Sequence, residues 1–217
     1  MKLLNCLQIN FTLTILLILK IGCVTPQISE KIWSDTPQIL LDSVSLSRTY
    51  AFTSLDSALK SPDKVYKLVL RKKKFKSFPK EIYQFKNLQY LDLSKNNIKE
   101  LPEDLDSLKL LQYFACSKCN ISKIPKSIGN LKYLYYLNLN QNNIDSLPDE
   151  IGNLERLQML DLWDNNLFYF PETLSRLHRL KKMDLRSILL NEQQQNYIQS
   201  LLPETKIYFS PPCKCSW

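Results

Sequence analysis

The feature that most constrains the fold of this chain is a phrase of 23 residues that recurs through its centre. The apolar residues at its first position fall into one column, at Val65, Leu88, Leu111, Leu134, Leu157 and Leu180. Self-similarity at a fixed period of this size is the signature of a solenoid. One copy is too short to bury its own apolar side chains, so neighbouring copies must stack. The 44% apolar fraction is sufficient for one continuous core.

Each copy is expected to contain a short strand and a return segment. Leu88, Leu91 and Leu93 are flanked by polar residues, which is typical of a strand with inward and outward faces. A Leu-Pro pair then breaks the strand, because Pro fixes φ and lacks a backbone N–H. Leu105 and Leu108 return the chain on a loose helical turn. Stacked copies then align their strands as a parallel sheet along one side.

This pattern resembles the leucine-rich repeat family, in the 23-residue class that carries Leu-Pro after the strand loop. The resemblance extends from Val65 to about Leu190. The proline column has no gap and consists of Pro79, Pro102, Pro125, Pro148 and Pro171. The resemblance implies an α/β fold: a leucine-rich repeat solenoid, wound as a right-handed curved superhelix. Its parallel β-sheet would be concave, with an N-terminal helical cap and a C-terminal helix-strand cap.

A second column of the family pattern holds asparagine. Three copies match, at Asn96, Asn142 and Asn165, whereas three depart, at Lys73, Cys119 and Ile188. Cysteine is an accepted substitute in the family, and the other two lie in terminal copies, which are expected to be atypical. The resemblance implies that this Asn is buried and bonds the backbone of adjacent coils. Its loss would leave backbone groups unpaired, at about 1–3 kcal/mol each.

The first 22 residues have the layout of a bacterial secretory signal peptide. Lys2 precedes an apolar run from Phe11 to Leu19, which is shorter than the roughly 20 residues of a transmembrane helix. Gly-Cys at Cys23 also resembles the lipoprotein signal, in which the Cys is lipidated, although Lys20 departs from that pattern. We therefore expect an exported protein, either secreted or held in the cell envelope as a lipoprotein through Cys23. A buried helix is the alternative interpretation of this run.

The other segments are assigned from composition and period. Residues 23–53 are polar without a period and are expected to be a tether or a partly ordered arm. Residues 54–64 place apolar side chains on one helical face, as expected of an N-terminal cap helix. Residues 65–187 contain five full repeats and a degenerate sixth strand. Residues 188–217 are expected to form a helix-strand cap followed by a tail.

Few residues suggest chemistry other than binding. Cys116 and Cys119 form a Cys-x-x-Cys pair, but their repeat positions point inward in the other copies, so we expect them to pack in the core. The lone His178 has no second His or carboxylate cluster with which to build a catalytic site. The basic run that begins at Arg71 lacks interleaved aromatics. We therefore expect no enzyme activity, metal, cofactor, nucleic-acid partner or small-molecule substrate.

The strands should present columns of outward side chains on the concave face. Tyr90, Tyr113 and Tyr136 recur at the third repeat position, and strands about 4.8 Å apart would align them as a ladder about 10 Å long. Tyrosine and tryptophan are enriched at binding hot spots. The alternative is cross-strand stacking that only stabilises the sheet. The candidate partner-binding residues are Tyr90, Tyr113, Tyr136, Met159, Trp163, Asp92, Asn138, Asp161, Lys67, Arg71, Lys182 and Arg186.

These patterns predict a non-catalytic protein-protein interaction module that is exported and binds a protein partner on its concave face. Membrane attachment would follow if Cys23 is lipidated. The partner would offer an apolar or aromatic ridge with acidic groups near its ends. The alternative function is an intracellular regulator that resembles the Ras-group leucine-rich repeat proteins and acts in signal transduction. That function requires residues 1–22 to remain uncleaved.

Overall fold

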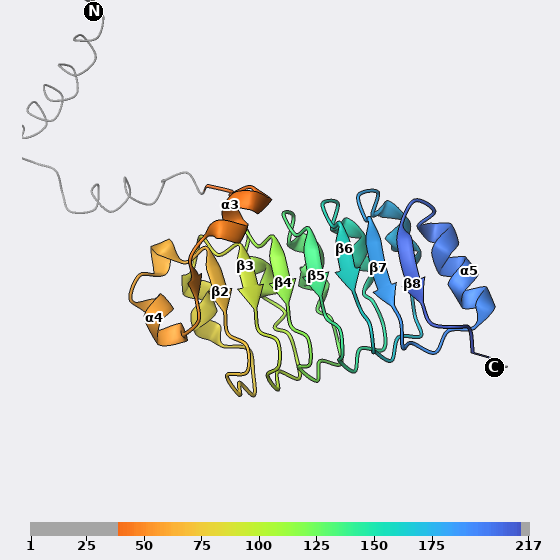
Figure 1. Cartoon of the computed structure of the whole chain (residues 1–217), viewed down its shortest axis with the longest axis horizontal. Coiled ribbons are helices and arrows are strands. Elements are labelled where there is room, and N and C mark those ends of the chain that lie inside the picture. Colours follow the sequence, from red (N-terminus) through yellow and green to blue (C-terminus); the bar gives the residue numbers. More distant parts are fainter. Residues whose placement is uncertain (1–38, 214–217) are drawn as a thin grey trace, which may run out of the picture. The chain divides into compact units, whose positions relative to one another are not determined.

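The computed structural model describes residues 39–213, and from Leu40 onward they belong to one compact unit. Within them, eight strands form one open parallel sheet in chain order, as Figure 1 shows. The strands are β1 (Ala51–Phe52), β2 (Lys67–Val69), β3 (Tyr90–Asp92), β4 (Tyr113–Ala115), β5 (Tyr136–Asn138), β6 (Met159–Asp161), β7 (Lys182–Leu185) and β8 (Lys206–Phe209). Neighbouring repeat strands pair in register, one repeat apart. The predicted leucine-rich repeat architecture with a parallel sheet is confirmed.

Short 3-10 helices return the chain behind the sheet (Figure 1). They are η2 (Lys80–Gln84), η3 (Leu105–Ser107), η4 (Lys126–Asn130), η5 (Asp149–Asn153) and η6 (Glu172–Arg176). In four of them a proline directly precedes the first helical residue, where its fixed φ suits the start of a turn. The coils stack tightly here: a Cβ on Gly152 would lie 2.3 Å from the backbone oxygen of Thr173. Glycine allows this close approach because it has no side chain.

The core lies between the sheet and the return segments. Its central row consists of the fully buried fourth-position residues Leu68, Leu91, Phe114, Leu137, Leu160 and Met183. One cluster of buried residues runs from Ala58 before the first repeat to Leu202 after the last. Each coil contacts only its neighbours, and most of that contact is buried apolar surface. Burial of this surface is therefore the main force that holds the coils together.

The N-terminal end contains more structure than the sequence indicated. α4 (Leu55–Leu59) and η1 (Pro62–Lys64) lie in the segment expected to be a cap helix, with Ala58 buried in the core. α3 (Ser43–Arg48) and β1 lie within residues 23–53, where a tether or partly ordered arm was expected. β1 pairs with β2 and so extends the sheet by one strand. Residues 1–22, Cys23 and the chain up to residue 38 lie outside the described residues.

At the C-terminal end, α5 (Glu192–Leu201) follows the last repeat strand. Asn191 and Gln194 form a capping box, in which each side-chain oxygen accepts from the other's backbone N–H at 2.9 Å. Ile198 is fully buried in the core, and β8 pairs with β7 along the open edge of the sheet. These elements cover the apolar end of the last coil. Among the described residues, no helix is long and apolar enough to cross a membrane.

Candidate functional site

The face of the sheet away from the core, which we call the concave face, carries the predicted tyrosine ladder. The ring centroids of Tyr90 and Tyr113 are 3.9 Å apart, those of Tyr113 and Tyr136 are 4.3 Å apart, and each pair of rings is inclined by 5°. Lys67 Nζ lies 4.9 Å from the centroid of Tyr90, over its ring. The faces within the stack therefore contact other tyrosines. A partner would meet ring edges and hydroxyl groups.

The hydroxyls of Tyr90 and Tyr113 stay protonated, and they interact with each other along the ladder. Burial is the largest cause that raises the pKa of Tyr113, with smaller contributions from Tyr90 and Tyr136. Burial also raises the pKa of Tyr90. Met159, opposite Tyr136 on the next strand, is 38% exposed and continues the column with an apolar side chain. The ladder and Met159 thus form one stripe across β3 to β6.

The acidic residues of the site are engaged in contacts within the chain. Asp92 is buried, accepts from Ser94 N at 2.9 Å, and lies 3.6 Å from Arg71 Nε. Asp184 accepts from Arg186 Nη2 at 2.6 Å. Because these two carboxylates are already paired, they offer a partner less negative charge than the sequence suggested.

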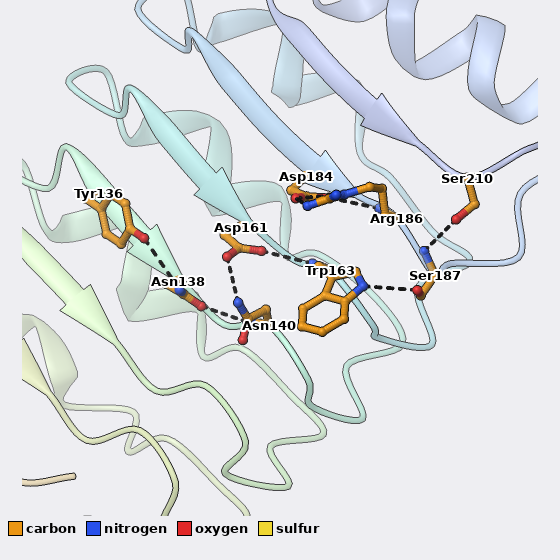
Figure 2. Close-up of polar contacts among 9 residues, drawn as sticks. All are labelled: Tyr136, Asn138, Asn140, Asp161, Trp163, Asp184, Arg186, Ser187 and Ser210. Atoms are coloured by element: carbon orange, nitrogen blue, oxygen red, sulfur yellow. Dashed lines mark hydrogen bonds and ion pairs between the residues drawn. The ribbon is translucent and has the colours of Figure 1, made fainter.

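A hydrogen-bonded network fixes Trp163 at the C-terminal part of the concave face, as Figure 2 shows. Its Nε1 donates to Ser187 Oγ at 3.0 Å, and its backbone N donates to Asp161 Oδ1 at 3.2 Å. Asp161 Oδ2 accepts from Asn140 Nδ2 at 2.7 Å, and Asn140 N donates to Asn138 Oδ1 at 3.0 Å. Burial raises the pKa of the Asp161 carboxyl. The network holds the half-buried indole in one orientation.

Several site residues were missed by the sequence reasoning. Ser187 accepts from the Trp163 indole, and Asn140 bonds Asp161. In β8 the third-position column continues to Lys206, and Tyr208 lies opposite Asp184. Asn140 stands in the seventh-position column, so the spacing alone identifies it as outward. The β8 residues follow the end of the 23-residue period, so the repeat gives no signal for them. Lys182, at the far end of the predicted column, is exposed.

The N-terminal end of the concave face is occupied by the chain itself. Leu41 N donates to Gln89 Oε1 at 2.9 Å, and Leu41 O accepts from Gln112 Nε2 at 2.7 Å. Lys67 Nζ donates to Ser47 O at 3.1 Å. The Lys67 ammonium, expected to contact a partner, is thus engaged by the end of α3. Sequence spacing gave no indication of these contacts.

The structural asparagines hold neighbouring coils together. Asn142 Nδ2 donates to Cys116 O and Leu139 O at 2.9 and 2.8 Å, and its Oδ1 accepts from Cys119 N and Ile121 N at 3.0 Å. Asn96 and Asn165 make the same kind of contacts. The Asn142 amide therefore satisfies four buried backbone groups from two coils. Without the amide, these groups would have no hydrogen-bond partner from the Asn142 side chain.

The two cysteines of the Cys-x-x-Cys pair lie in the core. Cys116 Sγ contacts Cys119 Sγ at 2.9 Å, and Cys119 Sγ lies 3.3 Å from Leu93 O. Leu93 O is the type of carbonyl that the Asn amide bonds in other coils, so the thiol takes over part of that role. Burial raises the pKa of the Cys116 thiol. Among residues 39–213, no group of three His, Cys, Asp or Glu is placed to hold a metal ion.

Comparisons with known proteins identify the repeat. Residues 63–121 match a family model described as "Leucine rich repeat", and residues 125–201 match one described as "Leucine-rich repeat region". No curated protein sequence matches the chain. A leucine-rich repeat protein of Leptospira interrogans is 35% identical with a TM-score of 0.61, over 65% of this chain and 36% of that one.

A plant receptor shows the same fold at greater distance. The plant peptide hormone receptor RGFR1, solved in complex with RGF2, is 24% identical with a TM-score of 0.58, over 76% of this chain and 26% of that one. This chain therefore spans well under half of the length of either structure. The two family matches together cover most of the repeat region, and their descriptions agree with the coil geometry. The chain belongs to the leucine-rich repeat family.

Proposed function

We propose that this protein is a non-catalytic interaction module that binds a protein partner on its concave face. The observation that carries the proposal is the stripe of Tyr90, Tyr113, Tyr136 and Met159, which faces outward although the fold requires no aromatic residue there. Solenoids present extended surfaces suited to binding macromolecules. Trp163, held by the network around Asp161, adds a second rigid aromatic anchor.

The stacked geometry favours a particular kind of partner. Ring edges carry the positive side of the aromatic quadrupole, and the protonated hydroxyls can donate hydrogen bonds. The stripe therefore suits an apolar or aromatic ridge accompanied by hydrogen-bond acceptors. Stacking of nucleic-acid bases is disfavoured, because the ring faces inside the ladder already contact each other.

A row of lysines beside the stripe supports acidic groups on the partner. Lys72, Lys95 and Lys118 occupy the eighth position of three consecutive coils, are exposed, and have φ of 57°, 62° and 54°. None of them forms an ion pair with a residue that the structure describes. Left-handed backbone costs a non-glycine residue about 1–2 kcal/mol, and adjacent like charges repel. The same left-handed φ recurs at the eighth position of later coils, in Gln141, Asp164 and Ser187, so it belongs to the coil and not to the lysines. The support for attraction of an acidic segment is therefore the row of three like charges.

Site-specific photo-crosslinking in the native cell tests the proposal. A photoreactive side chain at Met159 is expected to capture a discrete protein partner, whereas the same group at Arg179, exposed on a return segment, is not. The captured protein is then purified and its affinity measured directly. Equal capture from both positions would argue against a concave binding site.

We also propose that the protein is exported, as a secreted protein or as a cell envelope lipoprotein through Cys23. The support is the signal-like pattern of residues 1–23. Intact mass of the cellular protein is the test, together with Cys23→Ser, which should release a lipidated form from the membrane fraction. Met1 still attached to the mature protein would favour the intracellular regulator instead.

A further inference from the structure

The N-terminal arm, defined here as Leu40–Arg48, lies on the concave face and is recognised mainly through its backbone. Gln89 and Gln112 bond each other at 2.8 Å, and together they bond the N–H and the C=O of Leu41. Two side-chain amides thus bond both backbone groups of one residue, whose side chain is half-buried. Proline could not replace Leu41 here, because it has no N–H to donate.

Both glutamines are buried where the arm lies. Gln89 is 0% exposed and Gln112 is 6% exposed, whereas Gln158 at the same repeat position is half-buried and Lys181 is exposed. Buried amides are costly without hydrogen-bond partners. A chain segment placed over β3 and β4 is therefore the natural complement of these two side chains.

The arm contains one fully buried apolar side chain. Leu46 is 1% exposed but is not part of the contiguous core cluster, so it is buried outside the solenoid core. The end of α3 also approaches the tyrosine ladder, because Ser47 O accepts from Lys67 Nζ, which lies over the ring of Tyr90. The arm thus occupies surface next to the proposed partner site (Figure 1).

The arm is held by few contacts. α3 has six residues, and Ser43, Val44, Ser45, Ser47 and Arg48 are all exposed. A helix of this length is unstable by itself, although Asp42 caps it by accepting from Val44 N and Ser45 N at 2.9 Å. Three hydrogen bonds to the sheet side chains and one buried leucine hold it in place. A segment held by so few contacts opens locally at a low cost in free energy.

We propose that the arm is a displaceable occupant of a peptide-binding site on the first three coils. The partner that replaces it presents the same chemistry: one non-proline residue with both backbone groups facing Gln89 and Gln112, followed by a short helix with an apolar residue five positions later. Displacement would free Lys67 and open the end of the ladder at Tyr90. This inference rests on the proposed function only in assigning the replacement to a protein partner.

The full-length chain tests the inference without any partner. Leu46→Asp removes the apolar anchor, and Val44→Asp adds the same charge at an exposed position of the same helix. Trypsin cleavage between Arg48 and Thr49, followed by mass spectrometry, is expected to be slow in wild type and in Val44→Asp and fast in Leu46→Asp. Leu41→Pro, which removes the N–H that Gln89 accepts, should release the arm in the same way.

A labelled synthetic peptide of residues 39–50 serves as the probe. It should bind the Leu46→Asp protein at least about tenfold more tightly than wild type or Val44→Asp. In those two proteins the arm occupies the site, and the apparent affinity falls in proportion to the fraction of sites that is free. Gln112→Ala combined with Leu46→Asp should abolish that gain. Equal peptide affinity for all the proteins, or no binding to the released forms, would overturn the inference. Arms exchanged between two wild-type molecules, detected by intermolecular crosslinks, would also overturn it.

The test of the arm and the test of the proposed function can fail independently of each other. Loss of partner binding in ladder variants tests the concave site, whereas arm release and peptide binding are measured on the chain alone. Leu41 and Leu46 lie outside the core cluster, so substitutions there are expected to leave the solenoid folded. An unchanged thermal melt of the repeat region serves as the check.

Discussion

The rings of Tyr90 and Tyr113 lie parallel, with centroids 3.9 Å apart and planes inclined by 5°, although the two residues are on different coils. Parallel in-register pairing of β3 and β4 places them opposite each other. Aromatic pairs contribute about 0.5–1.5 kcal/mol beyond area burial, whereas a binding hot spot contributes 2 kcal/mol or more. Because Tyr113 stacks on both Tyr90 and Tyr136, the two roles are separated by measuring stability and affinity on the same variant.

Leu137→Ala should destabilise the protein by about 2–5 kcal/mol, because flanking coils cannot close the resulting cavity. Leu137 is fully buried in the central row of the core. The measurement is a urea melt, with Glu155→Ala at an exposed position as the control, expected to change stability by less than about 0.5 kcal/mol. A loss below about 1 kcal/mol for Leu137→Ala would contradict the core assignment.

Asn142→Ala should be far more destabilising than Asn143→Ala. The Asn142 amide bonds four buried backbone groups, each worth about 1–3 kcal/mol when left unpaired. Asn143 is the adjacent residue and has an exposed side chain, so it controls for the type of substitution. The two variants are compared by chemical denaturation. Similar losses in both would show that the Asn142 amide does not hold the coils together.

The repeat made most of the sheet predictable. A period of 23 residues fixes which side chains share a column, so the parallel register and the alignment of Tyr90, Tyr113 and Tyr136 follow from the sequence. The pairing of Asp184 with Arg186 does not follow from strand alternation, because β7 ends at Leu185 and Arg186 lies in the turn after it. The column alone does not fix ring orientation, which depends on side-chain torsions.

The arm was not predictable from local pattern. Leu41 contacts Gln89 and Gln112, which lie 48 and 71 residues further along the chain. A six-residue helix with one buried side chain produces no recognisable hydrophobic period. The only available signal was the second repeat position, which holds Gln89, Gln112 and Gln158 and carries Tyr or Lys in the other copies. The arm that lies over Gln89 and Gln112 accounts for the burial of their amides.

Asp161→Asn should alter the pH dependence of stability. Burial raises the pKa of Asp161 in the folded protein above its ordinary value of 3.8. Between that value and the raised pKa, the folded state binds more protons than the unfolded state, so this group lowers stability as pH rises. The variant should lack this decrease in urea melts between pH 4 and pH 7. Asp164→Asn, an exposed neighbour, controls for the loss of one charge. An equal or steeper decrease in Asp161→Asn would contradict the assignment.

The lysine row should influence association more than dissociation. Replacing Lys72, Lys95 and Lys118 together by Gln should slow binding of the captured partner and weaken its salt dependence, because long-range attraction acts on encounter. Lys86, Lys109 and Lys132 form a matched control, being exposed lysines at one repeat position of the same coils. Stopped-flow kinetics at several salt concentrations measure both sets. Equal effects from the two triple variants would assign no role to the row.

The central claim is that the tyrosine ladder binds the partner, and Tyr113→Ala tests it most directly. Affinity for the captured partner and the free energy of unfolding are measured on the same preparation. We predict a loss of binding of about 2 kcal/mol or more, with a smaller loss of stability, because cross-strand pairs contribute only about 0.2–1 kcal/mol each. Reduced stability with unchanged affinity would contradict the account and assign the ladder to the fold alone.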